Sequence, residues 1–234
     1  EMSRISQELV EHNAAVAGDG GELALVHFVS AGEHAMYAAR PARPGPTACA
    51  HTFPLRFERW AKQFREGVHV VTPAVRQIPP QCVDPRIKCR SRMHYYLADR
   101  QARAVDPEAV ALLLDLDGHV TETNGANFLM VRGGGLVSPP SAKTLAGVSR
   151  ATVLQLAARL GIGFSEVDLT VDDVLQADEA MLSGTPYCLL PVTRINSKQI
   201  GDGRPGKAFQ RLIAAWSDEV GIDIALQIGS IDGG

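Results

Sequence analysis

The chain has 234 residues, of which 45% are hydrophobic and 21% are charged, values typical of a globular protein with a sizeable core. Its formal net charge of -3 and its pI of about 6.2 exclude the strongly basic surface of a nucleic-acid-binding or membrane-surface protein, so we expect small-molecule partners, no nucleic acid and no membrane. It has no run of about 18 apolar residues, which excludes an ordinary membrane-spanning helix.

Four cysteines are scattered along the chain: Cys49, Cys82, Cys89 and Cys188. They form no C-x-x-C pair, and no histidines stand at metal-ligand spacing, so we expect no disulfide framework, no metal site and a reducing, cytoplasmic location. The chain begins Glu1-Met2-Ser3 with no basic-then-apolar leader, so we predict no signal peptide in it and expect further residues upstream of Glu1.

The N-terminal part of the chain has one helix pattern and two strand patterns. Residues 4–16 are predicted to form a helix, and the apolar run over 23–30 is predicted to form a buried strand bounded by the glycines of 18–21. A second short strand is expected near 35–39. The prolines of 41–46 cannot continue either kind of element, so we expect a boundary or an exposed loop there or just beyond.

A hairpin dominates the middle of the chain. Asp117-Gly118 is a two-residue turn signal between apolar runs, so the chain is expected to return on itself there. Lys88 then precedes a helix, and Glu122 lies on the returning strand. The elements expected here are a strand over 68–72, a helix over 90–104 and strands over 109–116 and 119–123.

The rest of the chain is predicted to contain another hairpin and two helices. The first of these helices, over 148–160, has apolar residues at helical spacing and ends at Gly161. The other elements expected are strands over 128–132 and 136–138 around a turn at 133–135, a strand region over 174–182, a strand over 191–195 and a helix over 207–216.

Lys88 lies among three arginines, Arg86, Arg90 and Arg92. A lysine that forms a Schiff base needs a neutral amine, and nearby positive charge lowers the pKa of an ammonium group. The sequence therefore makes Lys88 a candidate nucleophile. The alternative interpretation is an ordinary surface lysine in a basic cluster.

Two further stretches are suited to binding an anion. Gly147-Val148-Ser149 opens the predicted helix over 148–160, where free N–H groups and the helix dipole attract negative charge and a glycine permits close approach. Ser183-Gly184-Thr185 offers a second turn with hydroxyls and amides. Taken alone, each is also a common structural feature, a serine-containing helix start or a plain turn.

Glu122 completes this set of groups. Alone it would be interpreted as a solvated carboxylate at the edge of a sheet. With Lys88 and the two anion-binding turns it suggests a phosphate joined to an aromatic aldehyde, as in pyridoxal phosphate, because a carboxylate that keeps the pyridine nitrogen protonated makes the ring an electron sink. Asn124 and Asn127 are interpreted as turn residues.

Five motifs in residues 84–206 carry a resemblance to a known family: V-T-E-T-N-G-A-N-F, L-V-S-P-P, L-A-G-V-S-R, A-D-E-A-M-L-S-G-T and L-P-V. In these motifs the chain resembles the class IV, or fold type IV, pyridoxal-phosphate enzymes. These comprise branched-chain aminotransferases, D-amino acid aminotransferases and aminodeoxychorismate lyases. The stretch from Lys88 to Glu122 aligns with branched-chain members without gaps.

The resemblance implies an α/β (α+β) fold of two α/β domains with the cofactor between them, and a homodimer. It identifies residues 1–54 as the C-terminal part of the small N-terminal domain, with an upstream segment absent, and residues 55–234 as the large cofactor-binding domain. It implies that Lys88 forms the Schiff base and moves the substrate proton, and that Glu122 pairs with the pyridine nitrogen. The other cofactor-binding residues that it implies are Leu145, packed on the ring, and Gly147, Val148, Ser149, Gly184 and Thr185 around the phosphate.

Several features depart from the family pattern. The segment that carries a phosphate-binding arginine in H-x-x-R-L is absent, and Met93 stands where branched-chain members commonly have a tyrosine, with Tyr95 and Tyr96 beyond it. Pro186, after S-G-T, has no N–H to offer a substrate carboxylate. K-C-R-S-R-M also resembles the K-x-x-N-R-L string of the lyase branch, with Ser91 in place of asparagine.

The sequence favours one function over two alternatives. The favoured one is an aminotransferase that uses a Lys88 Schiff base to move the amino group of an amino acid, with a branched-chain-like donor favoured, to a 2-oxo acid in two half-reactions. An aminodeoxychorismate lyase would instead release pyruvate and 4-aminobenzoate. A non-catalytic relative would keep the fold as a binding module, and the presence of both Lys88 and Glu122 argues against it.

Overall fold

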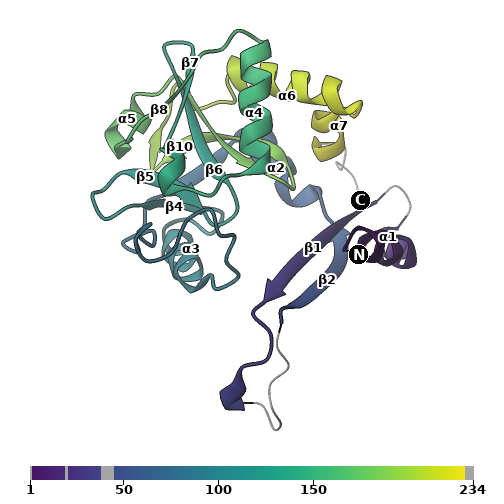
Figure 1. The fold of residues 1–234 in the computed structure, drawn as a ribbon. Coiled ribbons are helices and arrows are strands. Elements are labelled where there is room, and N and C mark those ends of the chain that lie inside the picture. The colour runs from purple at the N-terminus through teal and green to yellow at the C-terminus, as the bar shows by residue number, and fades with distance from the viewer. Residues whose placement is uncertain (1, 19–20, 38–44, 230–234) are drawn as a thin grey trace. The chain divides into compact units, whose positions relative to one another are not determined.

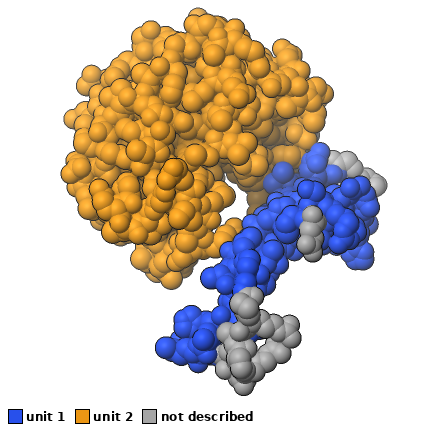
Figure 2. Space-filling view, viewed as in Figure 1, with its two compact units in different colours: residues 1–56 blue, residues 57–234 orange. Residues whose placement is uncertain are grey.

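The computed structural model describes residues 2–18, 21–37 and 45–229, and the chain divides into two compact units, Glu1–Arg56 and Phe57–Gly234 (Figure 2). Apart from Gly45 and Pro46, the proline-rich stretch expected over 41–46 lies outside the described residues. Within the described part of the chain, no helix is both long and apolar enough to cross a membrane.

The first unit contains a helix and a two-stranded antiparallel sheet (Figure 1). The two strands pair along their whole length, from Glu22 opposite Leu55 to Ser30 opposite Thr47. The elements of this unit are α1 (Met2–Asn13), the 3-10 turns η1 (Ala14–Ala17) and η2 (Ala35–Tyr37), and the strands β1 (Glu22–Ser30) and β2 (Thr47–Leu55).

The helix predicted over 4–16 and the strand over 23–30 are confirmed as a helix and a strand, although the helix tightens into a 3-10 turn at its end. The burial expected of this strand is wrong, because no residue of β1 is buried and Val29 is 65% exposed. The short strand expected near 35–39 is wrong in its described part. The Tyr37 N–H donates to the His34 carbonyl oxygen at 3.0 Å, which closes a tight turn instead. Strand β2 was not predicted. It contains Pro54, which a strand at the edge of a sheet tolerates.

The second unit is built on a nine-stranded mixed sheet, shown in Figure 1. Six of its strands pair in a closed circle: β10 with β3, β3 with β4, β4 with β5, β5 with β6, β6 with β9, and β9 with β10. The strands are β3 (Val68–Val71), β4 (Val110–Leu114), β5 (Val120–Thr123), β6 (Asn127–Arg132), β7 (Gly135–Ser138), β8 (Phe164–Glu166), β9 (Glu179–Gly184), β10 (Cys188–Ile195) and β11 (Lys198–Gln199).

Successive side chains point to opposite faces along the strands of this closed circle, which divides the core into packed clusters. On β4, Leu112 and Leu114 join one cluster with Phe128 and Met130 of β6, whereas the intervening Leu113 packs with α3. Another cluster joins the other side of β6 and β9 to α4, α6 and α7. The helices are α2 (Glu58–Glu66), α3 (Met93–Val105), α4 (Val148–Arg159), α5 (Val171–Leu175), α6 (Lys207–Val220) and α7 (Ile224–Gly229), with a 3-10 turn η3 (Ser141–Lys143) before α4.

Most of the predictions for this unit hold. The hairpin at Asp117-Gly118 is confirmed, with Gly118 at φ 88°, and so is the helix over 148–160. The strand region expected over 174–182 is wrong at its start, where residues 171–175 form α5. Thr170 and Asp173 exchange hydrogen bonds in a capping box, which nucleates that helix. Helices α2 and α7 and strands β8 and β11 were not predicted.

Replacing Leu112 by alanine is expected to lower the free energy of unfolding by about 2–5 kcal/mol, because the fully buried side chain would leave a cavity inside the core. Leu116→Ala is the matched control, since Leu116 lies in the turn after β4 and is 69% exposed. Its effect should stay below about 0.5 kcal/mol. Urea unfolding of the full chain measures both, and equal losses would contradict the place of Leu112 in the core.

Candidate active site

A cavity of about 480 Å³ opens in the second unit, a volume in the range of small-molecule sites. Four parts of the chain line it, from within 77–95 and from 122–127, 145–149 and 183–185. All of the residues that the sequence predicts for the site lie along this cavity: Lys88, Glu122, Leu145, Gly147, Val148, Ser149, Gly184 and Thr185. The fold therefore brings together groups that are far apart in the chain.

Lys88 lines the cavity from the loop that precedes α3. Arg92 ties this loop to the turn after β5, because its Nε donates to Asn124 Oδ1 at 3.0 Å and its Nη2 donates to the Asn124 carbonyl oxygen. The pKa of Lys88 is lowered from its ordinary value, first by partial burial of the amine and then by the charge of Arg92, with Glu122 opposing. A lowered pKa increases the share of the neutral amine, the form that attacks a carbonyl carbon.

Glu122 lies on β5 and is only 6% exposed, so the interpretation of a solvated edge carboxylate is wrong. Four donors converge on its two oxygens. Oε1 accepts from Gln77 Nε2 at 3.1 Å and from the Tyr95 hydroxyl at 3.0 Å. Oε2 accepts from Asn127 Nδ2 at 3.2 Å and from the Leu145 backbone N–H at 3.0 Å.

Two influences on the pKa of Glu122 oppose each other. Burial is the larger and raises the pKa above its ordinary value, because a charged carboxylate is poorly solvated in the interior. The Leu145 N–H, the Tyr95 hydroxyl and the positive charges of Arg92 and Lys88 act in the lowering direction. Among the described residues, the carboxylate is thus stabilised in place by hydrogen bonds rather than by a direct ion pair.

A row of polar side chains crosses three adjacent strands at this point. Glu122 of β5 lies opposite Asn127 of β6, and Asn127 lies opposite Ser183 of β9. Residues in such opposed positions project from the same side of a sheet, and all three line the cavity. The Ser183 hydroxyl is buried and has no hydrogen-bond partner within the described structure, which leaves it available to a ligand.

The start of α4 provides backbone donors at the cavity. Gly147 is its N-cap residue, no side chain in the described structure caps it, and Val148 and Ser149 of its first turn line the cavity. A Cβ on Gly147 would come within 2.0 Å of Asn127 Oδ1, so this close approach requires glycine. A Cβ on Gly184 would likewise come within 2.9 Å of the Tyr187 ring.

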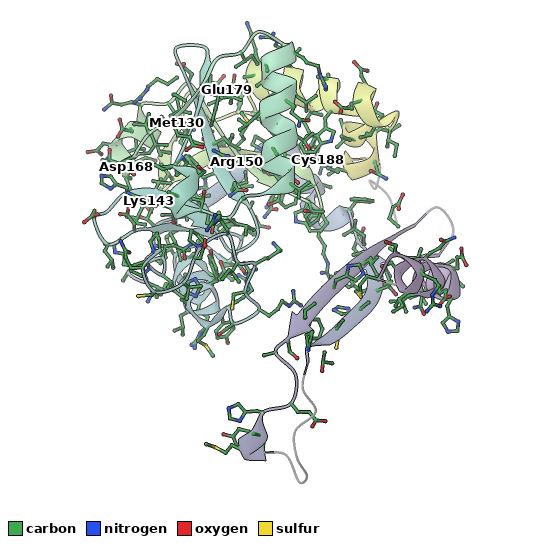
Figure 3. All side chains as sticks on the ribbon, viewed as in Figure 1. Met130, Lys143, Arg150, Asp168, Glu179 and Cys188 are labelled. Carbon is green, nitrogen blue, oxygen red and sulfur yellow. The ribbon has the colours of Figure 1, made fainter. Side chains whose placement is uncertain are left out.

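Arg150 of the L-A-G-V-S-R motif does not line this cavity. Its Nη2 donates to Ser138 Oγ at 2.8 Å and to Glu166 Oε1 at 2.7 Å, while its guanidinium lies over the Phe164 ring. Arg150 is labelled in Figure 3. The arginine therefore fastens α4 to β7 and β8. It holds the helix whose first turn lines the cavity.

Sequence reasoning missed Gln77 and Tyr95 and misread Asn127. Asn127 was expected in a turn, but it is a buried residue of β6 whose amide bridges Glu122 and the Leu145 carbonyl oxygen, at 2.9 Å from the latter. Tyr95 had a usable signal, because it repeats with Ala98 and Ala102 at helical spacing on the buried face of α3. Gln77, a lone polar residue after β3, had none.

A second group of titratable side chains lies outside the cavity lining. The ligand atoms of Asp115, His119 and Asp168 lie within 4.8 Å of one another. Lys143 Nζ already donates to Asp115 at 2.8 Å and to Asp168 at 2.6 Å (Figure 3 labels Lys143 and Asp168). One lysine ammonium thus pairs with both carboxylates, and the contact anchors η3 just before Leu145.

The comparison with known families agrees with this arrangement. The family model described as amino-transferase class IV matches residues 1–195. The chain belongs to the class IV aminotransferase family. Within it, the branched-chain-amino-acid aminotransferase of Pseudomonas aeruginosa is 36% identical over 110 residues, which are 47% of this chain and 36% of that protein.

Solved structures of class IV aminotransferases share the fold. A crystal structure of the Escherichia coli branched-chain amino acid aminotransferase matches 94% of this chain and 70% of its own, with a TM-score of 0.82 and 22% identity. The branched-chain amino acid aminotransferase from Thermobaculum terrenum, in its PLP-form, matches 97% of this chain and 72% of its own, with a TM-score of 0.78 and 22% identity. The chain spans between 27% and 53% of the length of the first curated relatives that it matches.

Lys88 is expected to react with an amine-specific reagent at lower pH than Lys62, because burial and Arg92 lower the pKa of Lys88 from 10.5 whereas Glu108 raises that of Lys62. Trinitrophenylation of the cofactor-free full chain across a pH series, read per lysine by peptide mass spectrometry, measures both in one sample. Arg92→Gln should move the Lys88 midpoint upward and leave that of Lys62 unchanged. A Lys88 midpoint at or above that of Lys62 would contradict the assignment.

Proposed function

We propose that this protein is a pyridoxal 5'-phosphate-dependent aminotransferase that transfers the amino group of an amino acid, with branched-chain-like donors favoured, to a 2-oxo acid. The observation that carries the proposal is the meeting, along one cavity, of an amine with a lowered pKa, a buried carboxylate and two anion-binding turns. Membership of the class IV family and the similarity to the Pseudomonas aeruginosa enzyme support it.

The residues along the cavity fit this cofactor. A volume of about 480 Å³ suits a ligand of its size. The unbonded backbone N–H groups at the start of α4 suit a phosphate, and the buried hydroxyl of Ser183 gains a partner only from a polar ligand atom or water. Glu122 offers the carboxylate that a protonated ring nitrogen needs.

Each predicted site residue then has a role in binding. Glu122 pairs with the ring nitrogen, and the Leu145 side chain packs on the ring while its backbone N–H holds Glu122. The phosphate is held by the backbone N–H groups of Val148 and Ser149 and by the turn at Gly184 and Thr185, with the Thr185 hydroxyl as a further donor. Gly147 allows the close approach, since its own N–H donates to the Leu145 carbonyl oxygen at 2.8 Å.

When bound, pyridoxal phosphate supplies an aldehyde for covalent attachment and a ring that withdraws electrons from the substrate carbon. Lys88 Nζ is the attachment point in this proposal. The neutral Nζ would then serve as the base that takes the proton from the substrate carbon and as the acid that delivers it to C4' of the cofactor. Arg92 favours the neutral state of this amine and lies in the loop that orients it.

The same proposal extends to domains and assembly. We assign the first unit to the small domain and the second unit to the large cofactor-binding domain, because the cavity is lined by the second unit. The resemblance to class IV enzymes supports a homodimer, and the scattered cysteines support a reducing, cytoplasmic location. The named branched-chain aminotransferases among the relatives favour transamination over the lyase reaction.

Lys88→Ala should abolish the visible absorption band that the full chain forms with pyridoxal phosphate, and should lower transamination by about 10²-fold to 10⁴-fold or more, because the attachment point and the base are both lost. Lys62→Ala is the matched control, since Lys62 is an exposed lysine paired with Glu108. It should leave the spectrum and the rate unchanged. Loss of the band in both variants, or in neither, would contradict the role of Lys88.

The same spectra test the reaction class. L-branched-chain amino acids, L-glutamate and D-alanine are added in turn to the loaded full chain, and the donor that converts the visible band to that of the amine form of the cofactor identifies the donor class. Release of pyruvate from aminodeoxychorismate without an added 2-oxo acid, with no donor shifting the band, would replace the aminotransferase by the lyase.

A further inference from the structure

Tyr95 and Gln77 form a closed hydrogen-bonded triangle with one oxygen of Glu122. The Tyr95 hydroxyl donates to Glu122 Oε1 at 3.0 Å, and Gln77 Nε2 donates both to the same oxygen at 3.1 Å and to the Tyr95 hydroxyl oxygen at 2.8 Å. All three side chains are buried, with 9% or less of each residue exposed. The three residues are thus largely shielded from solvent at the wall of the cavity.

The surroundings fix the direction of each bond in this triangle. Gln77 Oε1 accepts from the Ile78 backbone N–H and lies 3.1 Å from His94 Nε2, so the amide nitrogen of Gln77 must face Glu122. Burial, and then the charge of Glu122, raise the pKa of Tyr95, which keeps the phenol protonated as a donor. Both residues thus present hydrogens, and only hydrogens, to the carboxylate.

Their supporting elements hold these donors in place. Tyr95 packs on the buried face of α3 with Ala98 and Ala102, against Leu113 of β4. The Gln77 backbone N–H donates to the Leu114 carbonyl oxygen at 2.9 Å. Each donor is therefore positioned by a packed element rather than by the ligand, which is the condition for a preorganised site.

The other oxygen of the carboxylate offers the place where a ligand donor can enter. An ionised carboxylate has about four acceptor positions, and all four are filled by protein donors here. The Asn127 contact, at 3.2 Å, is the longest, and its amide also donates to the Leu145 carbonyl oxygen. A ring N–H can replace the Asn127 donor at Oε2, because Asn127 keeps its hydrogen bond to the Leu145 carbonyl oxygen. Oε1 meanwhile keeps both of its donors.

We propose that Tyr95 and Gln77 are positioning residues that act through Glu122: their bonds to Oε1 keep the carboxylate ionised and oriented to bind the ring nitrogen of the cofactor. This inference rests on the proposed function. It gives Tyr95 and Gln77, which are not among the residues proposed to hold the phosphate and the aldehyde, control of one contact, that between the carboxylate and the ring nitrogen. The ring nitrogen is therefore the atom at which the test is made.

The experiment compares pyridoxal phosphate with its 1-deaza analogue, which has carbon in place of the ring nitrogen. Apparent dissociation constants of the full chain for both are measured by spectroscopic titration in the unmodified protein, in Tyr95→Phe and in Tyr96→Phe. Tyr96 is the matched control, because it is the adjacent tyrosine of α3 and is 58% exposed. Phenylalanine keeps the ring packing and removes only the hydroxyl.

We expect Tyr95→Phe to weaken binding of pyridoxal phosphate by about 10-fold or more, the effect of losing one hydrogen bond to a charged group. Binding of the deaza analogue should change by less than about 2-fold, since no ring N–H is present to lose its partner. Tyr96→Phe should alter neither. Gln77→Leu should reproduce the Tyr95→Phe pattern. In a protein that already carries Glu122→Gln, Tyr95→Phe should not weaken binding of pyridoxal phosphate any further.

Other outcomes overturn the inference. Equal weakening for both ligands would show that Tyr95 acts through packing alone, and unchanged binding of both would show that it has no role at the ring nitrogen. If Tyr95→Phe does not fold, as judged by circular dichroism, Gln77→Leu decides by the same criterion. If the unmodified chain fails to bind pyridoxal phosphate, the proposed function and the inference both fail. If the unmodified chain binds it but the variants do not give the expected pattern, the inference alone fails.

Discussion

The buried carboxylate of Glu122 is the group on which the arrangement of the cavity depends. A carboxylate removed from water and left without donors is strongly destabilised. Here four donors from four different segments supply what water would have supplied: Gln77 after β3, Tyr95 on α3, Asn127 on β6 and Leu145 before α4. Because each donor belongs to a different element, satisfying one side chain also fixes the positions of these segments around the cavity.

The closed circle of six strands makes this convergence possible. Since β5, β6 and β9 are neighbours in the circle, Glu122, Asn127 and Ser183 fall in one row. A sheet that closes on itself, with a packed apolar interior, has little freedom to shift its register. The polar row therefore rests on a rigid support, and α4, fastened by Arg150 to Glu166, brings its first turn to the same place.

Burial shifts the pKa values of Lys88 and Glu122 in opposite directions, whereas the charge of Arg92 shifts both in the same direction. Burial lowers the pKa of Lys88 and raises that of Glu122, as expected for a cation and an anion removed from water. The positive charge of Arg92 lowers both pKa values. Arg92 therefore favours a neutral amine and an ionised carboxylate at the same time, the pair of states that acid-base chemistry at a cofactor ring requires.

The sequence by itself determined the local features: the hairpin at Asp117-Gly118, the helix over 148–160 and, mostly through family resemblance, the residues that line the cavity. These follow from turn chemistry, helix starts and motif order, which depend on neighbours along the chain. Even local reasoning erred where a capping box turned residues 171–175 into a helix. Only the tertiary structure decided that Tyr95 and Gln77 meet Glu122 and that Asn127 belongs to a strand. Those contacts join Glu122 to residues 27 and 45 positions away, and they exist because the strands close into a circle, which no local pattern specifies.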